Sequence, residues 1–322
     1  REWVLSGGMH DEDRKLLSRI LSANEDELWE LIKNNPKVYI YKWEKEFKDD
    51  EGRTVYLDLS RPFGEITVLR IKGARPRVKP GTHEILKYED GVGYTANDVA
   101  IDEKARCVSF KSRDIPFGTM RVEEAMNEYE IMKQDYDKDY LQLDFPVAVG
   151  VYKNERFENK PVGFVIAGMK EIDYRLLSGL EDGIPGQHSF LNSWEGFSIE
   201  EKEVILEKVG KAVREYHDRG NFHKYLHFGN IGIEYGAGTS RIDIKNVILR
   251  DLDESVRSNN FKFNDDVTTF KKRIAAWRLF DLYRFMRNFK DESDRDKLIV
   301  YFLSGYFYKD KLPGYYLLDL FN

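Results

Sequence analysis

The fold of this chain is decided by residues 215–233, which read EYHDRGNFHKYLHFGNIGI. The stretch begins at the end of a helical pattern, and Gly220 is placed to stop that helix. The polar segment that follows ends at Asn230 and leads into an apolar run. A turn-rich insert, 234–240, then leads to a second apolar run that ends at Asp251, so the two runs predict a hairpin.

Within this stretch, residues 223–230 resemble the catalytic loop of the protein kinase and aminoglycoside phosphotransferase superfamily. In kinases that loop reads His-Arg-Asp-Leu, three variable residues and Asn. The Asp accepts the proton of the substrate hydroxyl and the Asn holds Mg²⁺. The segment HKYLHFGN keeps this register without gaps. The resemblance implies that Asn230 is a metal ligand, that Asp251 is the second ligand, and that ATP binds together with Mg²⁺ or Mn²⁺.

The aspartate position of the loop is occupied by Tyr225, a phenol whose unperturbed pKa of about 10 makes it a poor base. Phosphoryl transfer depends mainly on positioning and charge neutralisation, so the missing carboxylate weakens a transferase interpretation without ending it. The candidate catalytic residues are Tyr225, His223 and Asp253. In the kinase loop the histidine is usually a buried group that bonds to backbone, whereas Asp253 replaces the family's glycine and offers a second carboxylate. Asp218 and His227 are further substitutes for the base.

The resemblance also requires a lysine on a strand and a glutamate on the following helix, because their ion pair fixes the lysine against the nucleotide phosphates. Lys111 ends a predicted strand and Glu128 lies in the next predicted helix, so this pair is preferred. Glu124, one helical turn earlier, is the fallback. Lys72 is the rival lysine, but its separation from Glu128 would need a large insertion.

Glycines mark two further expected contacts with the nucleotide. Gly91 and Gly93, in DGVGYTA, lie where a glycine-rich phosphate loop would be, since glycine lets backbone N–H groups approach phosphate oxygens closely. The same residues are at least as typical of a plain hairpin turn. Gly168 and Met169 lie at the expected boundary between two lobes, and we expect them to contact the nucleotide.

The patterns along the chain, read with the resemblance, predict an α+β, bilobal, protein-kinase-like fold. Residues 1–36 carry two short helical patterns and form an N-terminal helical appendage. Residues 37–168 alternate short β-rich runs with turn residues and hold one clear helix, which predicts an antiparallel sheet with the counterpart of kinase helix C. Residues 169–322 read as a mainly helical lobe, with aromatic-rich helices at 267–290 and 295–308.

Two helix starts and one hairpin are specified by local signals. Capping boxes begin helices at Asn24 with Glu27 and at Ser198 with Glu201. The apolar runs 147–152 and 162–168 are joined by a polar turn, and together they predict a hairpin.

Composition narrows the partners and the compartment. The chain has 322 residues, a net charge of −6, 41% hydrophobic and 34% charged residues, which fits a packed globular protein and disfavours nucleic acid as a partner. The basic stretch 70–79 could meet phosphate groups, but the favoured interpretation is a solvated strand edge blunted by cations. No apolar run approaches the roughly 20 residues that span a bilayer. The single cysteine, Cys107, favours a reducing, cytoplasmic setting.

Two classes of function remain. In the first, the chain is a transferase that moves a phosphoryl or nucleotidyl group to an unknown acceptor. A loose resemblance to selenoprotein O, which moves a nucleotidyl group, rests on the shared plan and on residues 111–121. Gly229 departs from that family, which has a carboxylate there. In the second class, the chain is a pseudokinase that binds nucleotide or a protein partner without catalysis. A zinc site at His217, His223 and His227 is a minor alternative, because their spacing is not that of a helical histidine pair.

Overall fold

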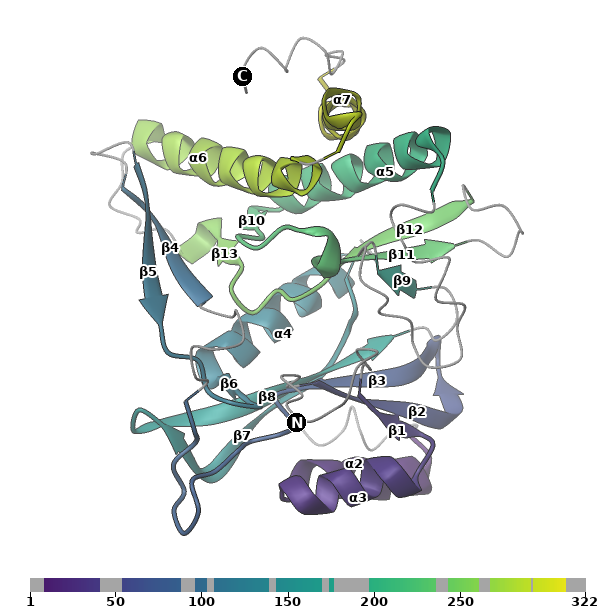
Figure 1. Ribbon diagram of the computed structural model, residues 1–322, viewed down its shortest axis with the longest axis vertical. Coiled ribbons are helices and arrows are strands. Elements are labelled where there is room, and N and C mark those ends of the chain that lie inside the picture. The colour runs from purple at the N-terminus through teal and green to yellow at the C-terminus, as the bar shows by residue number, and fades with distance from the viewer. Residues whose placement is uncertain are drawn as a thin grey trace. The chain divides into compact units, whose positions relative to one another are not determined.

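The computed structural model describes residues 9–40, 54–87, 96–102, 107–138, 143–169, 174–176, 197–235, 243–260, 267–290 and 292–310 (Figure 1). The chain divides into two compact units. Unit 1 comprises Arg1–Asp102, Val108–Asp139 and Asp144–Ile172, and unit 2 comprises Glu103–Cys107, Tyr140–Leu143 and Asp173–Asn322.

An antiparallel sheet forms the centre of unit 1. Its strands run in the order β1-β2-β3-β8, and both β6 and β7 pair with β8. Their bounds are β1 Val38–Tyr39, β2 Thr54–Phe63, β3 Ile66–Lys72, β6 Met120–Arg121, β7 Phe145–Phe157 and β8 Lys160–Met169. Tyr56 of β2 lies opposite Arg70 of β3, which lies opposite Ala167 of β8. Because side chains alternate along a strand, these three share one face, and Leu57 and Leu69 share the other.

Two N-terminal helices, α2 (Asp11–Ser22) and α3 (Glu25–Asn34), cover the face that carries Leu57 and Leu69 (Figure 1). One buried cluster joins the helices to the sheet and includes Leu17, Ile20, Leu28, Leu31, Val55, Leu57, Leu69, Ile71 and Ile166. Asp13 is fully buried and accepts hydrogen bonds from the backbone N–H and the hydroxyl of Ser60, at 2.9 and 2.6 Å. The two helices therefore belong to the hydrophobic core of unit 1.

Helix α4 (Val122–Tyr136) lies against the opposite face of the sheet, where Arg70 is located (Figure 1). The helix buries Glu124, Ala125, Glu128, Ile131, Met132 and Asp135, so its inner face carries acidic as well as apolar side chains. Between β3 and α4 in the sequence, β4 (Ala96–Asp102) and β5 (Cys107–Arg113) form a separate two-stranded sheet. The chain thus makes a long insertion between the strand of Arg70 and the helix that packs on it.

Three helices dominate unit 2: α5 (Ile199–Asp218), α6 (Val267–Met286) and α7 (Arg295–Tyr306). Helices α5 and α7 cross closely at Gly210 and Gly305. A Cβ atom at Gly210 would overlap the backbone of Phe302, and one at Gly305 would overlap the carbonyl of Glu207. Only glycine at both positions lets the two backbones meet in this way. In the described part of the chain, no helix has both the length and the apolar character needed to cross a bilayer.

Short strands of unit 2 frame the loop at residues 223–230. Strands β9 (Tyr174–Leu176), β11 (Ile231–Tyr235) and β12 (Ile244–Leu249) form an antiparallel sheet with β11 in the centre. Strand β10 (Asn221–Phe222) pairs with β13 (Val256–Arg257). A 3₁₀ turn at Phe228–Asn230 leads directly into β11.

The predicted α+β class, with an antiparallel sheet, is confirmed. Both capping boxes are present, because each cap side chain accepts from the N3 backbone N–H and the N3 glutamate accepts from the cap. The predicted hairpin at 147–168 is longer than expected, and its strands meet at Glu158 and Asn159, which both have positive φ. Gly91 and Gly93, the predicted phosphate-loop residues, lie outside the described residues.

Candidate functional site

The position of the two predicted metal ligands follows from the register of β11 and β12. Ile231 lies opposite Leu249. One residue further out, the backbone N–H of Arg250 donates to the carbonyl of Asn230 at 2.9 Å. Asp251 comes directly after this hydrogen bond. The fold therefore brings Asn230 and Asp251 to the same end of one hairpin.

The side chain of Asn230 is held by the loop itself. Its Nδ2 donates to the carbonyl of Tyr225 at 2.9 Å, and the residue is buried. Asp251 has a φ of 59°, in the left-handed region that non-glycine residues seldom adopt and that clusters at ligand sites. Amide and carboxylate oxygens are the hard ligands that Mg²⁺ takes together with phosphate oxygens. The donor set of Asn230 and Asp251 fits a magnesium ion.

The backbone of the loop is fixed by two buried groups. His223 is 1% exposed, and its Nε2–H donates to the carbonyl of Arg250 at 2.8 Å. Asp281 of α6 is fully buried and accepts from the backbone N–H groups of His223 and Lys224, at 2.5 and 2.7 Å. Lys224 has a φ of 70°, a conformation that needs such support. These contacts tie His223 to the backbone at Arg250, and the catalytic role predicted for it stays a prediction.

Tyr225, in the aspartate position of the loop, has two cations close to its ring. The Nζ of Lys224 is 5.7 Å and the Cζ of Arg284 is 5.4 Å from the centroid of its ring, which are cation–π distances. Lys224 also forms a buried ion pair with Glu254 at 2.9 Å. Burial lowers the pKa of Arg284, while Tyr225 acts in the opposite direction. Asp253, the predicted second carboxylate, is buried with 5% of its surface exposed.

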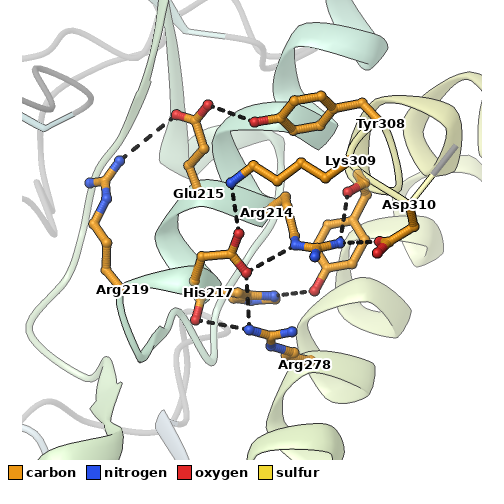
Figure 2. A network of polar contacts seen from close by, with 10 residues as sticks. Arg214, Glu215, His217, Arg219, Arg278, Tyr308, Lys309 and Asp310 are labelled. Carbon is orange, nitrogen blue, oxygen red and sulfur yellow. Dashed lines mark hydrogen bonds and ion pairs between the residues drawn. The ribbon is translucent and has the colours of Figure 1, made fainter.

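Asp218, a substitute for the missing base, is engaged in a network at the end of α5. Figure 2 shows this network and labels three of its cations, Arg214, Arg278 and Lys309. Its carboxylate accepts from Arg214 at 2.9 Å, from Arg278 at 3.1 Å and from Lys309 at 2.8 Å. Arg214 also donates to Asp310 at 2.5 Å. The network ties α5 to α6 and to the turn after α7. Asp218 therefore serves as a structural tie, since three cations compete for its oxygens.

Two of the three histidines near the loop are committed to protein groups. His217 contacts the Tyr306 hydroxyl through Nδ1 at 2.8 Å and Asp281 through Nε2 at 3.0 Å. Burial lowers the pKa of His217, although Asp281 opposes this. A neutral ring therefore donates to Asp281 and accepts from Tyr306. Within the described ranges, no group of three or more His, Cys, Asp or Glu side chains could hold a metal ion.

We expect the network around Asp218 to contribute to the acid dependence of stability. Partial burial raises the pKa of Asp218, but hydrogen bonds from Lys309 and Arg214 outweigh this and lower it. A carboxyl with a lowered pKa stabilises the folded state above its unfolded value of about 3.9, and this contribution is lost as the pH falls through the folded pKa. Asp218→Asn should lower the free energy of unfolding by about 1 kcal/mol at neutral pH. Below about pH 4, the variant should lose less stability than the wild type as the pH falls.

Urea unfolding from pH 7 to pH 3 measures this effect. Asp296→Asn, which changes an exposed aspartate in the first turn of α7, is the matched control and should keep the wild-type profile. An Asp218→Asn profile that runs parallel to that of the wild type would show that the network has no such role.

Unit 1 contains the predicted lysine–glutamate pair, but with a different lysine. Glu128 of α4 is fully buried and accepts from the Nζ of Lys72 at 3.0 Å and from the Nη2 of Arg70 at 2.8 Å. Cations from β3 therefore occupy both carboxylate oxygens. Lys111, the preferred partner in the sequence, lies in β5 of the separate two-stranded sheet, and its side chain is outside the description. The insertion between β3 and α4 explains why Lys72 and Glu128 pair although they are 56 positions apart in the sequence. The nucleotide contact predicted for Lys111 stays a prediction.

The interpretation of the basic stretch 70–79 as a solvated strand edge is wrong for its first half. Arg70, Lys72 and Arg75 have 6%, 3% and 5% of their surfaces exposed. Strand β3 lies between β2 and β8, so it is not an edge of the sheet. Arg75 stacks over the ring of Trp29 at 4.9 Å, which ties the stretch to α3.

Three other residues predicted to belong to the site, Glu124, Gly168 and Met169, make structural contacts in unit 1. Glu124, the fallback glutamate, is buried and accepts from the backbone N–H of Arg121 at 3.1 Å, so it caps α4. Gly168 lies opposite Leu69, and a Cβ there would overlap the side chain of Ile66. Met169 packs on the other face of the sheet, in a small cluster with Tyr56, Val68 and Tyr39. The nucleotide contacts predicted for Gly168 and Met169 stay predictions.

Sequence reasoning missed three buried charged groups: Asp281, Arg70 and Asp144. Asp281 lies between Phe280 and Leu282, which are both buried, and an acid inside an aromatic helix is a readable signal. Arg70 precedes Lys72 by two positions in a strand, so both must lie on one face. The signal for Asp144 is weaker, since nothing in its neighbourhood indicates a cation partner.

Comparison with known proteins gives likenesses of fold at low identity. No family model and no curated protein matches the chain. A structure titled WaaP in complex with acyl carrier protein is similar with a TM-score of 0.43 and 15% identity, over 70% of this chain and 83% of that chain. A Rio2 kinase-ADP/Mg²⁺-phosphoaspartate complex from Chaetomium thermophilum follows with a TM-score of 0.35 and 13% identity, over 84% and 62%. The BubR1 kinase domain has a TM-score of 0.32 and 12% identity, over 78% and 63%. With TM-scores below 0.5, these likenesses transfer no activity to the chain.

Proposed function

We propose that this chain is an atypical kinase-like transferase that binds ATP with Mg²⁺ or Mn²⁺ and moves a phosphoryl or nucleotidyl group to an acceptor. The observation that carries the proposal is the hydrogen bond from the Arg250 N–H to the Asn230 carbonyl. It places Asn230 beside Asp251, and these are the two oxygen-bearing residues that the loop resemblance identifies as metal ligands.

In unit 2, Asn230 and Asp251 would hold the divalent cation, which supplies positive charge to the phosphate oxygens during transfer. His223 and Asp281 keep the loop in place for this role, since Asp281 accepts from the loop backbone and His223 donates to the carbonyl of Arg250, directly before Asp251. A fixed loop matters because phosphoryl transfer gains most of its acceleration from positioning and electrostatics.

In unit 1, Lys72 would bind phosphate oxygens and Glu128 would orient it. A lysine that is 4% exposed and paired with a fully buried carboxylate has been desolvated at considerable cost. Such an arrangement is more readily explained by a binding role than by stability, because a buried ion pair is weak support for a fold. The pair supports the proposal independently of the loop in unit 2.

Nucleotide binding without transfer is the second candidate function, and the surroundings of Tyr225 favour it. The position of the kinase base holds a phenol with Lys224 and Arg284 close to its ring. Ammonium and guanidinium groups only donate, so they attract phosphate but do not accept a proton from a substrate hydroxyl. The first candidate function, group transfer, would have to proceed without a carboxylate base at this position, and a loose transition state permits this.

Intact-mass spectrometry after incubation with ATP and Mg²⁺ or Mn²⁺, together with measurement of ATP consumption, separates the two candidates. Gain of phosphate or AMP, or metal-dependent ATP consumption that Asp251→Asn abolishes, is the expected result for a transferase. Asp243→Asn, at an exposed aspartate just before β12 in the same hairpin, is the matched control and should behave as wild type. Metal-dependent binding with neither mass gain nor ATP consumption would establish the binding function, and absence of metal-dependent binding would overturn both.

A further inference from the structure

Two buried cations of β3 share a single carboxylate on α4. Glu128 accepts from Arg70 through Oε1 at 2.8 Å and from Lys72 through Oε2 at 3.0 Å. The side chain of Glu128 is fully buried, and those of Arg70 and Lys72 are 7% and 4% exposed. A lysine–glutamate pair needs only one cation, so Arg70 requires an explanation of its own.

Arg70 has a second anionic partner, Asp144. Its Nε lies 3.1 Å from the Oδ2 of Asp144, which is just before β7 and has 2% of its side chain exposed. Burial works against the Arg70 cation, but Glu128 and Asp144 more than offset this and raise its pKa. Arg70 therefore stays charged and links α4 to the start of β7, through a hydrogen bond from Nη2 to Glu128 and an ion pair between Nε and Asp144. A guanidinium group presents these two nitrogens in a fixed plane, which a lysine ammonium does not.

The four side chains balance in charge, with two cations and two carboxylates. This balance has a consequence for Lys72. In a lone buried pair, drawing the lysine toward a phosphate would leave its glutamate as an uncompensated buried anion, which is strongly unfavourable. Here Arg70 stays hydrogen-bonded to Glu128, so that carboxylate keeps one cationic donor after Lys72 has turned away, although the remaining group then holds one cation and two carboxylates. Lys72 can therefore turn toward an anion at a smaller cost in free energy.

We propose that Arg70 and Asp144 form a clamp that holds Glu128, and with it α4, in the position that pairs with Lys72 before any nucleotide or partner binds. The proposal rests on the function proposed for Lys72 and adds that the lysine–glutamate pair of unit 1 is permanently assembled. Arg70 and Asp144 are positioning residues in this account, because they act on the nucleotide through Glu128 and Lys72.

Hydrogen–deuterium exchange of the nucleotide-free, full-length protein tests the clamp directly. Asp144→Asn and Arg70→Met should speed exchange of the α4 amides around Glu128 by about tenfold or more, because local opening becomes easier when the clamp is lost. Arg70→Lys should restore the slow wild-type exchange only in part, since one ammonium group does not span Glu128 and Asp144. Arg77→Met, which removes a partly exposed pair with Glu25, is the matched control and should leave α4 unchanged.

Nucleotide affinity supplies a readout that a merely structural role would not move. With Mg²⁺ present, the clamp variants should bind ATP more weakly than wild type does, and their loss of AMP affinity should be smaller. The reason is that only the additional phosphates of ATP depend on Lys72. Equal α4 exchange in wild type, Asp144→Asn and Arg70→Lys would overturn the clamp. If α4 exchange is equal in those three proteins but Lys72→Met still loses ATP binding, the function proposed for Lys72 survives without the clamp. If Lys72→Met binds ATP as wild type does, that function fails, whatever α4 does.

Discussion

Lys72→Met should weaken ATP binding by at least about 30-fold while leaving the chain folded. Truncating one partner of a buried charge pair in a binding site costs about 2–5 kcal/mol, and each 1.4 kcal/mol corresponds to a factor of ten in Kd. The fold should survive because Glu128 keeps its bond to Arg70, so no buried carboxylate is left without a cation. Isothermal titration calorimetry with ATP and Mg²⁺ measures the effect, and circular dichroism checks the fold.

Two further variants give this prediction its contrast. Lys79→Met removes an exposed pair with Glu84 and should leave the Kd within about threefold of wild type, as expected for a surface ion pair. Lys111→Met tests the lysine that the sequence favoured. If Lys111→Met loses ATP binding and Lys72→Met does not, Lys111 is the nucleotide lysine after all, and the role given to the Lys72–Glu128 pair is wrong.

Asp281→Ala should destabilise unit 2 by about 3–5 kcal/mol, the largest stability effect expected in the molecule. The carboxylate is fully buried and serves three donors, namely the backbone N–H groups of His223 and Lys224 and the ring of His217. Alanine would leave buried donors without an acceptor, and each such loss costs about 1–3 kcal/mol. The conformation of Lys224 at positive φ would also lose its support.

Chemical denaturation of Asp281→Ala and Asp281→Asn, compared with wild type, measures the cost. The asparagine variant keeps an amide oxygen that accepts hydrogen bonds, so it should lose less stability than the alanine variant. Asp296→Ala, at an exposed site on α7, should stay within about 0.5 kcal/mol of wild type. A loss below about 1 kcal/mol for Asp281→Ala would show that the loop does not depend on this carboxylate.

Local signals in the sequence predicted much of the fold because they act over a few residues. The capping boxes at Asn24 and Ser198 form as expected, since an N-cap and its N3 glutamate satisfy each other within one helical turn. The hairpin of β11 and β12 was predicted from two apolar runs around a turn-rich insert. That hairpin also placed Asn230 and Asp251 together, so the candidate metal ligands of unit 2 were accessible from spacing alone.

The buried ion pairs of unit 1 were not accessible in this way. Lys111 was preferred over Lys72 because it is nearer to Glu128 in the sequence, on the assumption that residues near in sequence are also near in space. The strand pair β4 and β5 breaks that assumption, since it lies between β3 and α4 in the sequence and yet Lys72 of β3 pairs with Glu128 of α4. Arg70 and Asp144 were missed for a related reason, because their partners come from distant segments and tertiary burial, not local pattern, makes them significant.

The central claim is that Asn230 and Asp251 hold a divalent cation with the nucleotide, and calorimetric titration of ATP with and without Mg²⁺ tests it most directly. For the wild type, Mg²⁺ should tighten the Kd for ATP by about tenfold or more, whereas for Asp251→Asn the Kd should be nearly the same in both buffers. Asp243→Asn should keep the full effect of Mg²⁺. Wild-type binding that does not respond to Mg²⁺, or a Mg²⁺ effect that persists undiminished in Asp251→Asn, would contradict the account.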